Sequence, residues 1–148
     1  MLKTLDPVLS AELLYVLMLM GHGDDLVVCD VNHPAVTIAK HTTYGKLIDM
    51  PGCDIPRALK AILSLMPLDT FVPEPVMRMR VVGDPDAEVP IFAKVRATLA
   101  AGEGRDVAMG AYDRFDFYAA ARKSFAIVRT SDPGPYGCFI LRKGVITL

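Results

Sequence analysis

The chain has 148 residues, of which 52% are hydrophobic and 22% are charged, a balance typical of one globular domain with a substantial core. Its net charge is −1 and no basic run stands out, so we do not expect a nucleic acid as partner. The apolar stretch 13–20 is too short to cross a bilayer and lacks the features of a signal peptide, so we expect a cytoplasmic protein without a membrane partner.

Cysteine usage and hydropathy add two expectations. Cys29, Cys53 and Cys138 are odd in number and widely spaced, which is neither a disulfide framework nor a zinc-binding pattern. The mean hydropathy of +0.34 is high for a chain of this length and indicates more apolar surface than one small domain can bury. A rich core would also account for this value, but we expect a homo-oligomer that covers the excess.

The first predicted elements are a helix and a buried strand. Apolar residues at helical spacing predict a helix over 9–20, with Ser10 as its N-cap and Gly21 as its C-terminal cap. A short β-rich run over 26–29 then predicts a buried strand, which ends at Asp30. The chain therefore runs from a helix through a glycine-rich loop into a strand that ends on a carboxylate.

Helices and strands alternate along the remainder of the chain. The further expected elements are a short strand over 45–49, a helix capped by Asp54 that ends before Pro67, a half-exposed strand over 76–82, helices over 90–101 and 113–123, and strands over 125–129 and 139–141. No repeat or linker divides the chain. This pattern predicts an α/β layered fold in a single domain over 1–148.

His22 is the first candidate for chemistry. It lies between Gly21 and Gly23, which leave the imidazole uncovered, and histidine can exchange protons near neutral pH. A loop histidine with glycine neighbours is the alternative interpretation. His33 and His41 are expected at turns or on the surface, and the three histidines do not have a zinc-ligand spacing.

Further candidates lie at the end of a strand, on a helix and after a turn. Asp30 can bind a ligand at its strand end or simply cap a turn. Arg114 and Tyr118 are four residues apart and share a helix face, although a core aromatic helix with a surface arginine would have the same pattern. The segment Tyr136-Gly137-Cys138 follows a proline-rich turn and can line a pocket or merely begin a strand, and nothing nearby activates the Cys138 thiol.

The chain contains no nucleotide-binding or redox motif, so we expect neither a cofactor nor a metal. The type of chemistry that the sequence still supports is acid–base catalysis by histidine, aspartate and tyrosine side chains.

Taken in order, these motifs resemble the RbsD/FucU family of sugar mutarotases and pyranases, and in particular its fucose branch. The resemblance covers almost the whole chain. It is carried by Met20-Gly21-His22-Gly23-Asp24, Val28-Cys29-Asp30, Pro67-Leu68-Asp69, Arg114-Phe115-Asp116-Phe117-Tyr118 and Tyr136-Gly137-Cys138. The resemblance implies a mixed β-sheet flanked by helices, a cofactor-free isomerase acting on a monosaccharide such as L-fucose, and a ring-shaped decamer with sites near subunit contacts.

The resemblance also implies roles for individual residues. His22 is the implied proton donor, and Tyr118 is its expected partner in proton exchange. The implied substrate-binding residues are Asp30, Asp69, Arg114, Tyr136, Gly137 and Cys138. Cys138 departs from the family, which has asparagine there, and a thiol forms weaker hydrogen bonds than a carboxamide. This difference bears on the preferred sugar more than on the reaction.

Two other functions remain open at this point. A D-ribose pyranase would interconvert pyranose and furanose rings, but the segment that contains Arg114 and Tyr118 favours the fucose branch. A non-catalytic monosaccharide-binding accessory of a sugar transport operon would bind the sugar without exchanging its anomers.

Overall fold

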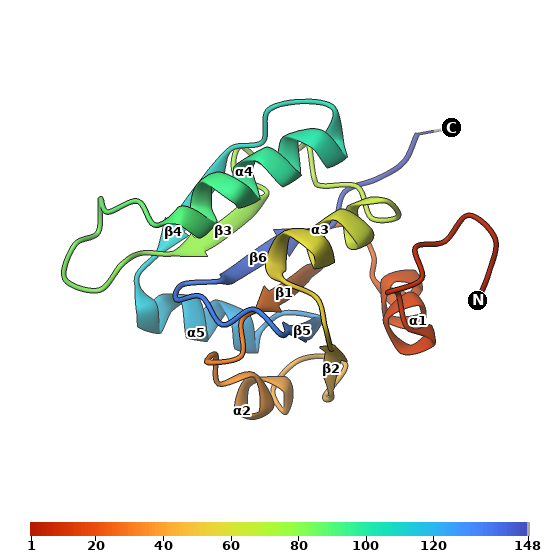
Figure 1. Cartoon of the computed structure of the whole chain (residues 1–148), viewed down its shortest axis with the longest axis horizontal. Coiled ribbons are helices and arrows are strands. Elements are labelled where there is room, and N and C mark those ends of the chain that lie inside the picture. The colour runs from red at the N-terminus through yellow and green to blue at the C-terminus, as the bar shows by residue number, and fades with distance from the viewer. Residues whose placement is uncertain (148) are drawn as a thin grey trace.

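The computed structural model describes residues 1–147 and shows one six-stranded sheet with helices on both faces (Figure 1). The strands are β1 (Asp25–Cys29), β2 (Leu47–Met50), β3 (Val76–Met79), β4 (Met109–Tyr112), β5 (Ala126–Thr130) and β6 (Cys138–Arg142). The helices are α1 (Ala11–Leu19), α2 (Ala35–Ala39), α3 (Ile55–Leu63), α4 (Pro90–Glu103) and α5 (Arg114–Arg122). The α/β class, the mixed sheet and the flanking helices are confirmed.

Strand direction decides which residues meet. The order across the sheet is β2-β5-β1-β6-β3-β4, and β6 pairs antiparallel with both of its neighbours, whereas every other pair is parallel. The carboxyl ends of five strands therefore lie at one edge of the sheet, together with the amino end of β6. Crossover folds form ligand sites at such an edge.

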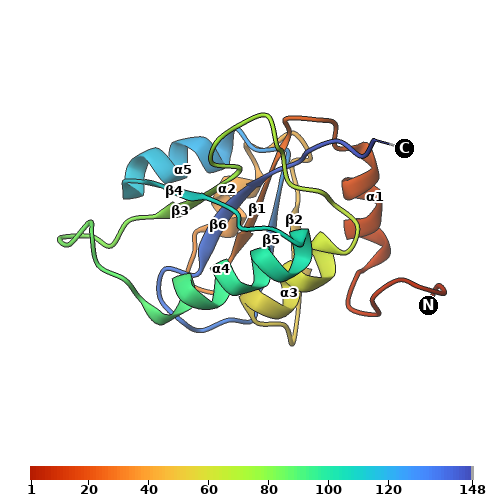
Figure 2. The same cartoon turned by 90° about the horizontal axis from the view of Figure 1, so that it is seen from above.

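Alternating side chains of the strands divide the core into two layers. Val28 and Phe139 pack with α1, α3 and α4, and Figure 2 shows α3 and α4 side by side over that face. Val27 and Ile140 point the other way and pack with α2 and α5. Because both faces are covered, β1 is apolar over 26–29 and β6 over 138–141, and their charged residues lie at the strand ends.

Two predicted helix starts are confirmed. The Ser10 side chain accepts a hydrogen bond from the N–H of Leu13 at 3.1 Å, and the Asp54 side chain accepts one from the N–H of Arg57 at 2.8 Å. The predicted C-terminal cap at Gly21 is wrong, because α1 ends at Leu19 and its C-cap is Met20, in extended backbone. Within residues 1–147, no helix combines the length and apolarity that a membrane crossing needs.

Other expectations need correction. The strand predicted over 76–82 as half-exposed is only four residues long and mostly buried. Arg78, expected on an exposed face, is buried because its guanidinium lies 4.3 Å from the centre of the Phe92 ring, which covers it. The short elements α2 and β4 were not predicted, and β4 forms chiefly through its pairing with β3.

Candidate active site

A polar pocket of about 310 Å³ opens at the carboxyl edge of the sheet. Its size lies at the lower end of the range for small-ligand sites. The lining residues are Asp30, Asn32, His33, Met79, Val82, Arg114, Tyr118, Pro135, Tyr136 and Cys138. The pocket therefore brings together five of the residues singled out from the sequence, which come from three separate segments of the chain.

Asp30 follows β1 and supplies a fixed carboxylate. Its Oδ1 accepts hydrogen bonds from the backbone N–H groups of Asn32 at 2.8 Å and His33 at 2.9 Å. The side chain is buried, and burial raises its pKa, although these hydrogen bonds partly oppose the change. Because Oδ1 is held by the backbone, the carboxylate keeps a single orientation toward the pocket.

Helix α5 contributes a cation and a phenol. Arg114 is the first residue of the helix and Tyr118 lies one turn later, so both side chains line the pocket. Phe117, between them in sequence, is fully buried under the sheet. The predicted shared face of Arg114 and Tyr118 is thus present, with the core aromatic residue Phe117 next to it.

The segment before β6 forms another wall. Tyr136 has a φ of 60°, a backbone conformation that is costly for a side chain of this size, and its hydroxyl accepts a hydrogen bond from the N–H of Val82 at 3.0 Å. At Gly137, a Cβ atom would lie 3.2 Å from the Cβ of Asp30, so the lack of a side chain permits close packing. Cys138 is buried, which raises the pKa of its thiol and makes it a poor nucleophile.

His33 differs from its predicted position at a turn or on the surface. It follows Asp30 in a tight turn but is only 8% exposed, with its ring edge-on to Phe117 at 5.7 Å and Tyr118 at 5.4 Å between centroids. Burial lowers its pKa to about 4, so the imidazole is neutral at pH 7. Sequence reasoning missed His33, because no local pattern reports that α5 covers it. His41 is exposed, as predicted.

His22 and Asp69 lie together but not in this pocket. His22 Nε2 is 3.1 Å from Asp69 Oδ1, and the pair lies beside the start of β1, where Asp69 N–H donates to the carbonyl of Arg142. A hydrogen bond from the N–H of Phe71 holds the pKa of Asp69 below its ordinary value, and His22 adds to this effect. The length of β1 separates the pair from Asp30 by more than about 15 Å.

The loop that carries His22 is held by the end of the chain. Gly23 N–H donates to the carbonyl of Lys143 at 2.9 Å, and the Lys143 N–H donates to the carbonyl of Asp24. The Lys143 ammonium also donates to the carbonyls of Leu17 and Met20 at the end of α1. The His22 side chain is 43% exposed. Its backbone is therefore held by the loop contacts, while its imidazole is accessible to solvent.

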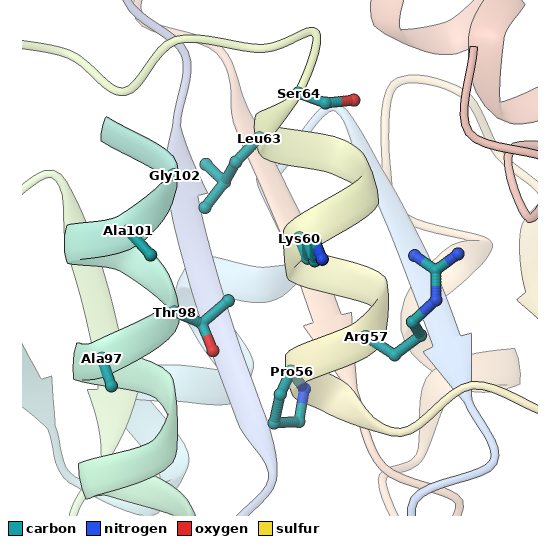
Figure 3. A pocket seen from close by; sticks show the side chains of 9 residues that line it. All are labelled: Pro56, Arg57, Lys60, Leu63, Ser64, Ala97, Thr98, Ala101 and Gly102. Atoms are coloured by element: carbon teal, nitrogen blue, oxygen red, sulfur yellow. The ribbon is translucent and has the colours of Figure 1, made fainter. Parts of the chain in front are cut away.

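A larger groove of about 650 Å³ lies between α3 and α4, away from the residues discussed above (Figure 3). Small and aliphatic side chains from the two helices form most of it, with Arg57 and Lys60 on the α3 side. Its lining residues in the described chain include no carboxylate, imidazole or phenol, so it lacks the groups needed for proton transfer.

The fold and the pocket define an α/β protein with a cavity lined by polar side chains at the carboxyl edge of its sheet. Comparison with known proteins is more specific. The chain belongs to the RbsD / FucU transport protein family, whose model matches residues 3–146.

Individual relatives match over nearly the whole length. Fucose mutarotase from Homo sapiens is 40% identical over 151 aligned residues, which cover 99% of this chain and 96% of the human protein. The crystal structure of the protein Atu2016 has a TM-score of 0.96 and 43% identity, covering 99% of this chain and 97% of that one. The crystal structure of the fucose mutarotase in complex with L-fucose from Streptococcus pneumoniae has a TM-score of 0.88 and 37% identity, covering 99% and 100%.

Proposed function

We propose that this protein is a cofactor-free sugar mutarotase that interconverts the α and β anomers of a monosaccharide, with L-fucose as its substrate. The observation that carries the proposal is the meeting of Asp30, Arg114 and Tyr118 in one pocket at the carboxyl edge of the sheet. The names of the human and streptococcal relatives support the reaction and the sugar. Carboxylate, guanidinium and phenol groups are all suited to hydrogen-bonding sugar hydroxyls.

The reaction needs two proton transfers. A base removes the proton of the anomeric hydroxyl while an acid protonates the ring oxygen, and the bond between the anomeric carbon and the ring oxygen breaks. The open aldehyde rotates, and the reverse transfers close the ring with the other configuration. We assign His22 as the acid to the ring oxygen and Tyr118 as its partner, while Asp30, Asp69 and Arg114 orient hydroxyl groups. Such assistance accelerates a reaction by about 10² to 10⁴-fold.

We infer that His22 acts in the pocket of a neighbouring copy, because within one copy it lies at the opposite edge of the sheet from Tyr118. An interface that joins one edge of a copy to the other edge of the next is heterologous, and repetition of such a contact forms a ring when the rotation between copies closes. A decamer built from such rings is the assembly we propose.

Exposed apolar side chains support this contact at both edges. Phe71 is 71% exposed and packs edge-on against His22, with the ring centroids 5.2 Å apart. Phe115 is 72% exposed and lies beside Tyr118. Aromatic residues are enriched at subunit interfaces, and burial at such an interface would remove both side chains from water.

The first test is saturation-transfer NMR between the anomers of L-fucose and, in parallel, between the forms of D-ribose. Faster exchange with L-fucose supports the proposal, and preference for D-ribose would instead indicate a pyranase. Sugar binding by calorimetry without any exchange would indicate a binding accessory and overturn the catalytic function.

Complementation tests the shared site. His22→Ala and Tyr118→Phe each remove one proton-transfer group, and each variant alone should bind sugar but exchange its anomers slowly. If the two groups come from different copies, mixed oligomers of the two variants contain about one quarter of sites with both groups intact, and activity returns to that extent. No recovery in demonstrably mixed oligomers would refute a site shared between copies.

A further inference from the structure

A residue that lines the pocket, His33, has one buried polar side-chain atom without a hydrogen-bond partner in the described chain. Of the buried side-chain nitrogen and oxygen atoms in residues 1–147, His33 Nε2 is the one without a hydrogen bond. His33 lines the pocket, and its backbone N–H is bonded to the carboxylate of Asp30, which lines the pocket as well. A buried polar group without a partner is destabilising, and native proteins rarely keep one unless it serves a purpose.

The surroundings of the ring explain why the chain does not satisfy it. Phe117 and Tyr118 both face the imidazole through their aromatic rings, in edge-to-face contacts that offer no strong acceptor. The backbone N–H of His33 is bonded to Asp30, which fixes the turn, and the rings of Phe117 and Tyr118 pack against the imidazole. The histidine is therefore held rigidly in the pocket wall with unused hydrogen-bonding capacity.

We propose that His33 is a specificity-determining residue that hydrogen-bonds a hydroxyl group of the bound sugar. This inference rests on the proposed function and deepens it. A neutral imidazole offers one donor and one acceptor, and a sugar hydroxyl can complement either. The Asp30 carboxylate can only accept hydrogen bonds, and the Arg114 guanidinium can only donate them. His33 adds a group that can either donate a hydrogen bond to a sugar hydroxyl or accept one from it.

The role is recognition rather than proton transfer. Burial lowers the pKa of the imidazole to about 4, so at pH 7 it carries no acidic imidazolium proton and is a weak base. A residue of this kind lowers the energy of bound sugar and transition state together, which affects KM more than kcat.

Three variants separate recognition from a structural role. His33→Phe keeps an aromatic ring against Phe117 and Tyr118 but removes both nitrogens, and His33→Gln keeps a donor and an acceptor. His41→Phe is the matched control, because it removes an exposed histidine outside the pocket. Each variant is assayed for L-fucose binding by calorimetry, for anomer exchange by saturation-transfer NMR, and for thermal unfolding without sugar.

We expect His33→Phe to raise Kd and KM for L-fucose about tenfold, to change kcat less than about twofold, and to raise the unfolding temperature. His33→Gln should recover part of the affinity, and His41→Phe should resemble the wild type. With a monodeoxy analogue of L-fucose that lacks the contacted hydroxyl, wild type and His33→Phe should bind equally.

The outcomes distinguish the two proposals. If the wild type does not exchange the anomers of any sugar tested, the proposed mutarotase function fails. If the wild type exchanges L-fucose and His33→Phe binds it as tightly, His33 is not a sugar-binding residue. A His33→Phe variant that is less stable and loses kcat and affinity together would show a structural role and overturn the inference.

Discussion

Acidification should destabilise the fold through His33. The pKa of this imidazole is about 4 in the folded chain and 6.5 when it is free in an unfolded chain. Between these values the unfolded state binds more protons, so the free energy of unfolding falls as the pH drops. The contribution of the neutral His33 to the free energy of unfolding is present above pH 6.5. About 2 kcal/mol of this contribution is lost between pH 7 and pH 5.

Other ionisable groups face the same ring and must be separated from it. Asp30 lies beside His33, and Arg114 and Tyr118 approach from α5. Burial raises the pKa of Asp30, so its protonation on acidification favours the folded state and opposes the loss. Because Asp30 is present in both wild type and His33→Phe, comparison of the two isolates the histidine.

Urea unfolding at fixed protein concentration, at pH 7, 6 and 5, measures the effect. The difference in unfolding free energy between His33→Phe and the wild type should grow by about 2 kcal/mol from pH 7 to pH 5. His41→Phe should follow the wild-type curve. Parallel curves for the wild type and His33→Phe would refute the burial of a neutral imidazole at this position.

Three further changes have defined outcomes. Asp30→Asn keeps the acceptor for the backbone N–H groups but removes the charge, so calorimetry should show intact folding and L-fucose binding weakened about tenfold or more. Ser10→Ala removes the cap on the N–H of Leu13 and should lower the free energy of urea unfolding by about 1 kcal/mol. Gly144→Ala would place a Cβ 2.6 Å from the carbonyl oxygen of Leu68, and the same assay should show a loss of about 1 to 3 kcal/mol. Unchanged L-fucose affinity in Asp30→Asn would contradict the role of the charge. An unchanged free energy of unfolding in Ser10→Ala or Gly144→Ala would contradict the role of the cap or of the close packing.

Features encoded by short-range spacing could be predicted from the sequence. The caps at Ser10 and Asp54 follow from a polar side chain placed just before a helical pattern. The shared face of Arg114 and Tyr118 follows from four-residue spacing, and Asp30 follows from its place at the end of an apolar strand. Each of these features depends on residues only a few positions apart, so it can be predicted from a single sequence.

Features created by long-range packing could not be predicted. His33 is buried only because α5 covers it, and Arg78 is buried only because Phe92 of α4 covers it. The position of His22 relative to the pocket depends on the direction of β1, which places its two ends at opposite edges of the sheet. His33 and Arg78 are polar and were expected at exposed positions, and His22 was expected beside the other site residues. The packing of distant segments places all three differently.

The contacts of Lys143 have a consequence for synthesis of the chain. Its backbone and ammonium hold the loop that carries His22 and the end of α1, and these contacts join residues more than a hundred positions apart. A nascent chain therefore cannot fix this loop until Lys143 has left the ribosome. The proton donor proposed at His22 acquires its final position only after more than a hundred further residues have been synthesised.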